Sequence, residues 1–216
     1  MTGRAWPDKG IVVVSLALLI GCGFLGLSDP RDATQTPETY RNHYFDFEIA
    51  LPKAWAVASQ QTAEAITQTG VEMVAGDGPG GRAAASAALK NSYQLLTISK
   101  HPLGSPVDFN PMLMVMAEKV SHLPGVKSGK DYLFHMKSAI RATRLPLKAD
   151  GEVVIADIGG SQFFRQIFRF DDPRMRATQS FNVAVRKGYA LCFVATYKGQ
   201  SQADELRWIL SSVYFD

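Results

Sequence analysis

The sequence has few of the features that stabilise or specialise small domains. Cysteine occurs twice in 216 residues, at Cys22 and Cys192, which excludes a disulfide-rich fold and a zinc site built from cysteine pairs. A surplus of charge is also missing, because 23 basic residues nearly balance 20 acidic ones. Nucleic-acid-binding domains concentrate basic residues on one face, so this balance argues against a nucleic-acid partner.

Motifs for catalysis and cofactor binding are absent as well. The glycine-rich residues 76–81 lack the Gly-Lys-Ser/Thr ending of a phosphate-binding loop, and the chain has no Gly-x-Ser-x-Gly nucleophile motif. Cys192 lies in the middle of an expected strand, where its thiol would have a raised pKa and poor access. The histidines show no metal-ligand spacing: His43, His101, His122 and His135. We therefore expect no enzyme activity, no metal and no cofactor.

The first 27 residues contain a long run without charge. Arg4 and Lys9 precede the uncharged residues 11–27, which is the layout of a secretory signal. The run Leu19-Ile20-Gly21-Cys22 resembles the bacterial lipobox, which implies acylation of the Cys22 thiol. An uncleaved helix over residues 11–27 and an ordinary cleaved signal are the alternatives. Either anchored form places the domain on the extracytoplasmic side, in a periplasm or on the outer face of the cytoplasmic membrane.

Composition divides the rest of the chain into a linker and one domain. Residues 28–42 are polar, include Pro30 and Pro37, and lack an apolar period, so they predict a linker that holds the domain off the membrane. Residues 43–216 are long enough to bury the core of a single domain without disulfides or metal.

Hydrophobic periodicity predicts the first elements of this domain. Residues 44–51 alternate between apolar and polar side chains and predict a half-buried strand, and residues 71–75 and 95–99 are further strand candidates. Asn110-Pro111 is typical of a helix start. Apolar stripes then predict two helices, the first with Leu113, Met116, Val120 and Leu123 and the second with Leu133, Met136 and Ile140.

The last third predicts an antiparallel sheet between helices. Strands are expected at residues 153–158, 162–170, 177–186 and 189–197, with Gly159-Gly160-Ser161 and Lys187-Gly188 as turns. The second turn pairs Val183 with Cys192 and makes both faces of this hairpin apolar, so both need a cover. A capping box at residues 201–204 opens a final helix, followed by a short strand at 214–215. The expected fold is a three-layer α/β/α sandwich around a mainly antiparallel sheet.

The two ends of the domain resemble a known family. Residues 45–55, Phe-Asp-Phe-Glu-Ile-Ala-Leu-Pro-Lys-Ala-Trp, look like the opening strand and proline-tryptophan corner of PsbP-like domains, which share the Ran-release-factor fold. The hairpin through Gly188, the helix from Ser201 and the closing residues 212–215 are similar to the end of such domains. Ala54 departs from the glycine that commonly precedes the tryptophan. The resemblance implies a non-catalytic binding or assembly module and provides no functional residue to carry over.

A basic and aromatic segment is the candidate partner-binding surface. Arg165 and Arg169 alternate with apolar residues, and Arg174 and Arg176 follow, so together they could dock an acidic partner. The leading hypothesis is a membrane-tethered extracytoplasmic lipoprotein that binds an unknown envelope or membrane-complex protein. A carrier or sensor of a small apolar ligand is the alternative, because the chain contains many phenylalanines and methionines. A hydrolase with dispersed catalytic residues is a third possibility.

Overall fold

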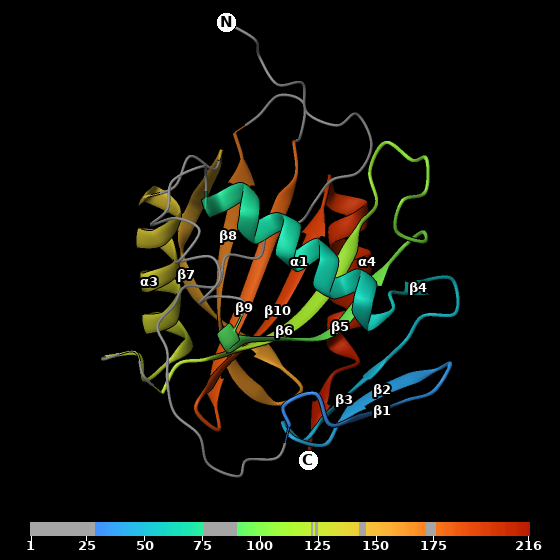
Figure 1. The fold of residues 1–216 in the computed structure, drawn as a ribbon, viewed down its shortest axis with the longest axis horizontal. Coiled ribbons are helices and arrows are strands. Elements are labelled where there is room, and N and C mark those ends of the chain that lie inside the picture. Colours follow the sequence, from blue (N-terminus) through green and yellow to red (C-terminus); the bar gives the residue numbers. More distant parts are fainter. Residues whose placement is uncertain (1–28, 76–89, 122, 124, 143–145, 172–175) are drawn as a thin grey trace, which may run out of the picture.

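A computed structural model describes residues 29–75, 90–121, 123, 125–142, 146–171 and 176–216, and Figure 1 shows their arrangement. The centre is a seven-stranded sheet in the order β4-β5-β6-β10-β9-β8-β7, in which every neighbouring pair is antiparallel. Its strands are β4 (Ala56–Val57), β5 (Ser92–Ser99), β6 (Met112–Lys119), β7 (Leu147–Ile158), β8 (Ser161–Phe170), β9 (Thr178–Arg186) and β10 (Tyr189–Tyr197).

A second sheet and the helices complete the layers. Helices α1 (Gln60–Ala75) and α3 (Gly129–Ala142) lie on one face of the main sheet, and α4 (Gln200–Ser211) lies on the other, as Figure 1 shows. The small sheet, in the order β1-β2-β3-β11, packs beside α4 and shares its core. Its strands are β1 (Ala33–Gln35), β2 (Thr39–Asn42), β3 (Phe47–Ala50) and β11 (Tyr214–Phe215). The predicted α/β/α sandwich is therefore confirmed.

The hairpin of β9 and β10 divides the interior into two cores. Its register pairs Tyr189 with Arg186 and Cys192 with Val183, as the sequence predicted. Leu191 and Phe193 face the core under α4 and the small sheet, whereas Cys192 and its neighbour Val194 face the core under α3. Both faces of the β9–β10 hairpin are therefore buried, and this burial of apolar surface stabilises the fold. Each face needs a layer of helices or strands packed against it.

The predicted helix over residues 110–123 is wrong, because residues 112–119 form the inner strand β6. Met112, Met114 and Met116 pack into one core, while Leu113 and Val115 pack into the other. A strand that is buried on both faces has no polar side to show alternation, so its continuous apolar run also fits a helical stripe. The second predicted helix is confirmed as α3, with Leu133, Met136 and Ile140 buried.

Two other predictions near the amino-terminal end are also wrong. Residues 71–75 do not form the expected strand, because they are the end of helix α1, which begins at Gln60. The predicted linker at residues 28–42 contains β1 and β2, which pair with each other and with β3. These strands are only three and four residues long, and one of the two buried positions of β2 is the polar Asn42, so residues 28–42 show no apolar period. The signal segment and Cys22 lie outside the described residues.

The final helix forms where predicted, but with a different start. Gly199 is the residue before α4, with a φ of 98°, and no side chain caps the helix, so the capping box expected at residues 201–204 is absent. Instead, the backbone N–H of Ala203 donates to the carbonyl of Gly199 over 3.2 Å. Leu206, Ile209 and Leu210 of this helix are buried. Within the described part of the chain, no helix is both long and apolar enough to cross a membrane.

The turn between β7 and β8 packs tightly against the end of the chain. Gly159 and Gly160 both have positive φ, at 61° and 72°. A Cβ atom on Gly159 would lie 2.7 Å from the carbonyl oxygen of Val213 and 2.8 Å from the Cα of Tyr214, whereas a Cβ on Gly160 would meet nothing within 4 Å. Gly159 thus allows the turn to contact the segment that leads into β11.

We predict that Gly159→Ala lowers the free energy of unfolding by about 2 to 4 kcal/mol, because it adds a backbone clash to the cost of a left-handed residue. Gly160→Ala is the matched control and carries only the conformational cost, about 1 to 2 kcal/mol. Urea denaturation followed by circular dichroism measures both losses. Equal losses in the two variants would contradict the packing described for Gly159.

Candidate functional site

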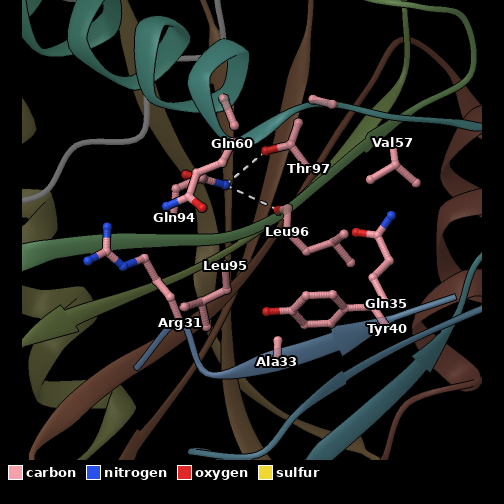
Figure 2. Close-up of a pocket in the computed structure, with 12 residues that line it drawn as sticks. Arg31, Ala33, Gln35, Tyr40, Val57, Gln60, Gln94, Leu95, Leu96 and Thr97 are labelled. Atoms are coloured by element: carbon pink, nitrogen blue, oxygen red, sulfur yellow. Dashed lines mark hydrogen bonds between the residues drawn. The ribbon is translucent and has the colours of Figure 1, made fainter. Parts of the chain in front are cut away.

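A small pocket lies where the edges of the two sheets meet (Figure 2). Ala33 and Gln35 of β1 and Tyr40 of β2 form one side, while Val57 and Thr97 lie on the opposite side. Leu95, Leu96, Gln94, Arg31 and the first turn of α1 complete the wall, and the enclosed volume is about 200 Å³. This volume suits one side chain or a small ligand fragment.

The polar groups of the pocket are held in place by their neighbours. The Tyr40 hydroxyl accepts a hydrogen bond from Asn42 Nδ2 at 3.3 Å, and burial of the ring raises the pKa of this phenol. Arg31 Nε lies 3.1 Å from Asp29 Oδ1, and Arg31 Nη1 lies 3.8 Å from Glu64 Oε1, so carboxylates balance the charge of this arginine. The pocket therefore offers hydrogen-bond donors without a strong uncompensated charge.

A basic surface lies at the other end of the main sheet, on the face that α4 partly covers. We define this basic surface as Arg165 and Arg169 of β8, Tyr197 of β10 and Arg207 of α4. Burial raises the pKa of the Tyr197 phenol, and the nearby charges of Arg169, Arg165 and Arg207 oppose that shift. The guanidinium groups therefore lie close to one phenol, although they come from separate elements.

The arginines of the basic surface differ in how far their charge is balanced. Arg169 forms an ion pair with Asp150, and Arg207 forms one with Asp204. Arg165 instead donates from Nε to the neutral amide oxygen of Asn182 at 2.7 Å, and no carboxylate of the described residues pairs with it. The charge of Arg165 thus stays available to an anionic group from outside the chain.

The structure places part of the predicted arginine cluster together. Arg165 and Arg169 share a face of β8, as alternation requires. Arg176 is exposed just before β9, and Arg174 lies outside the described residues. Sequence reasoning missed Tyr197 and Arg207, which are distant in the chain. Strand register could have found Tyr197, because it pairs with Thr178, which in turn pairs with Arg169.

A buried polar cluster lies beneath α3, away from both surfaces. Glu118 of β6 is 0% exposed, its Oε2 accepts from the Tyr132 hydroxyl, and its Oε1 has no partner among the described residues. Burial raises the pKa of Glu118 to about 8. The neighbouring Cys192 is 1% exposed, and burial raises the pKa of its thiol, as the sequence predicted. A neutral thiol without access to solvent is a poor nucleophile.

The other candidate chemistry finds no support in the described part of the chain. His43 bonds to Thr34 Oγ1 at 2.7 Å, His101 and His135 are exposed, and His122 lies outside the described residues. The described residues contain no cluster of three or more histidine, cysteine, aspartate or glutamate side chains placed to hold a metal. Most of the described phenylalanines and methionines that suggested an apolar ligand pack into the two cores, and the pocket between β1, β5 and the first turn of α1 is lined by polar as well as apolar residues.

Comparison with known proteins finds similarity among solved structures. No protein-family model matches the chain, and no curated protein matches it. Among solved structures, the chain is similar to the solution structure of cyanobacterial PsbP (CyanoP) from Synechocystis sp. PCC 6803, with 13% sequence identity and a TM-score of 0.48. The match covers 92% of this chain and 99% of that chain. No residue role is taken from this similarity.

The buried carboxyl of Glu118 should make stability depend on pH. Because its pKa is about 8 in the folded state and 4.5 is the ordinary value, the folded chain keeps a proton that the unfolded chain has released between these pH values. The contribution of Glu118 to the free energy of unfolding is fully present below pH 4.5 and is lost as the pH rises to 8. The free energy of unfolding therefore falls by up to about 1.4 kcal/mol per pH unit across this window.

We predict that Glu118→Gln removes this slope, because the amide does not ionise. Urea denaturation at a series of pH values measures the slope. The difference between variant and wild type gives the contribution of Glu118 to the pH dependence of the free energy of unfolding. Glu38→Gln is the control, since Glu38 is exposed and should leave the slope unchanged. Parallel curves for wild type and Glu118→Gln would show that Glu118 is not held neutral.

Proposed function

We propose that this chain is a non-catalytic binding module, tethered to a membrane on its extracytoplasmic side, that docks an acidic segment of a partner protein on the basic surface. The observation that carries the proposal is the position of Arg165, whose charge has no carboxylate partner among the described residues. Arg169 and Arg207 lie near the same phenol and extend the positive surface around it.

Rigid elements hold this surface in place. The side chain of Asn182 is fully buried, and its Nδ2 donates to the carbonyl of Phe193 at 3.2 Å, which turns Oδ1 toward Arg165. Arg165 is thereby fixed before a partner arrives, so less side-chain entropy is lost on binding. Trp208, next to Arg207 on α4, is 62% exposed. Exposed tryptophan and arginine are the residues most enriched in protein interfaces.

The charges of the basic surface suit a carboxylate-bearing partner. An acidic segment would reach Arg165 directly and could displace Asp150 and Asp204 from their arginines without leaving a buried charge unpaired, because both ion pairs are exposed. Exposed pairs contribute little to stability, so their exchange costs little. Binding through such a surface should weaken as ionic strength rises.

We predict that Arg165→Gln weakens binding of a fluorescent hexaglutamate peptide by roughly fivefold, the effect of about 1 kcal/mol. Fluorescence anisotropy of the full chain in detergent measures this affinity at low and physiological salt. Arg41→Gln is the matched control, since Arg41 is an exposed arginine of the small sheet that pairs with Glu48 and Asp216. An equal loss in both variants, or no salt dependence, would count against the proposed surface.

The tether part of the proposal rests on Cys22 and the sequence before it. The basic start, the uncharged run and the lipobox-like residues 19–22 support acylation of this thiol. Several acyl chains give stable membrane attachment. Cys192, the other cysteine, is buried in the core under α3 and is not accessible for such a modification.

We predict that Cys22→Ala moves the protein from the membrane fraction to the soluble fraction and removes the acyl mass seen by mass spectrometry. Cys192→Ala is the control and should stay in the membrane fraction with its acyl mass unchanged. Retention of Cys22→Ala in the membrane would exclude lipidation as the anchor and favour the uncleaved helix over residues 11–27.

A further inference from the structure

The open edge of β1 borders the pocket and has free backbone groups. The N–H of His43 donates to the Asp32 carbonyl at 2.8 Å, and the N–H of Thr36 donates to the Thr39 carbonyl at 2.9 Å. Hydrogen-bonded pairs alternate along an antiparallel ladder, so Thr34 bonds to β2 while Ala33 and Gln35 direct their N–H and C=O groups to the open side. β1 is the outermost strand of its sheet.

The side chains of the same strand point into the pocket. Ala33 pairs with Asn42 and Gln35 pairs with Tyr40, so these side chains lie on the inner face of the small sheet, and Ala33, Gln35 and Tyr40 line the pocket, as Figure 2 shows. A further strand beside β1 would turn every second side chain to this inner face. One of its side chains would therefore enter the pocket.

The chemistry of the pocket favours an uncharged side chain. Its walls are mixed, because Leu95 and Val57 are apolar while Gln35 and Gln94 are polar and neutral. Asp29 and Glu64 already balance the charge of Arg31, so a charged side chain of either sign would gain little there.

The edge strand at the other end of the main sheet is protected against pairing with a further strand. β7, the outer strand of the main sheet on that side, carries exposed Lys148, Asp150 and Glu152, and a bulge interrupts its pairing between Asp150 and Val154. Charges and bulges are the usual protection of an edge strand against further pairing. β1 has neither, because its sequence is Ala-Thr-Gln and its pairing with β2 is regular.

We propose that the open edge of β1 binds an extended peptide segment of a partner protein as an additional strand, with one uncharged side chain of that segment in the pocket. The backbone groups of Ala33 and Gln35 provide the affinity, and the pocket selects the side chain. This site lies at the opposite end of the main sheet from the basic surface, so the proposal stands or falls independently of the proposed function.

The test uses the full chain in detergent micelles and a series of short capped peptides. Each peptide has the sequence Lys-Thr-X-Thr-Lys, with leucine, alanine or aspartate at the central position. Amide hydrogen exchange followed by NMR reports whether the peptide bonds to Ala33 and Gln35. We expect the leucine peptide to slow exchange of these amides about tenfold and the aspartate peptide to leave it unchanged.

Two variants of β1 test the edge. Gln35→Pro removes an N–H that points away from β2, so it should weaken binding of the leucine peptide about tenfold and leave the β1–β2 ladder intact. Thr34→Val is the matched control, because the Thr34 side chain lies on the outer face of β1, and it should bind as the wild type does. Circular dichroism confirms that both variants fold.

Three results would overturn the proposal. Unchanged exchange at Ala33 and Gln35 with every peptide would show that the edge does not accept a strand. Protection of the Val57 amide in place of β1 would assign the peptide to the edge of β4. Slow exchange at Ala33 and Gln35 before any peptide is added would show that another occupant, such as residues 23–28 of this chain or a second copy, already fills the edge.

Discussion

Burial of both faces of the β9–β10 hairpin is the constraint on which the structure depends. Phe193 on one side and Val183 on the other are fully buried, so both faces of the main sheet must be shielded from water. Helices α1 and α3 cover one face, and α4 with the small sheet covers the other. The basic surface lies on this second face, beside α4, and the pocket lies where the small sheet meets β5 and α1. These are the two places where the proposed partners would bind.

Much of this architecture could be predicted from local chemistry, particularly in the last third of the chain. Lys187 and Gly188 fixed the register of the hairpin, and its two apolar faces implied three layers. The failures share a physical cause. In β6, burial on both faces erased the alternation that marks a strand, and in β1 and β2 the pairing partner β3, not an apolar pattern, determines the structure. Arg165 and Arg169 were recognised because they alternate on one strand, whereas Arg207 joins them only through tertiary packing.

The proposed binding role rests on accessible groups and not on the buried polar cluster. Glu118 and Cys192 are both enclosed in the core under α3, and burial raises the pKa of each. The arginines around Tyr197 and the open backbone of β1 are accessible instead. Arginine recognises negative charge, and an open strand edge recognises extended peptide. The two proposed surfaces, on one rigid sheet, would suit a module that joins components of an assembly.

The most direct test of the binding account is site-specific photo-crosslinking in the native membrane. A photoreactive residue in place of Arg207 samples whatever lies on the basic surface, and the same residue in place of exposed Lys127, which precedes α3, samples another part of the molecule. The account predicts a discrete cross-linked product from position 207 that is absent at 127 and decreases when Arg165→Gln is added. No product at 207, or equal products at both positions, would contradict it.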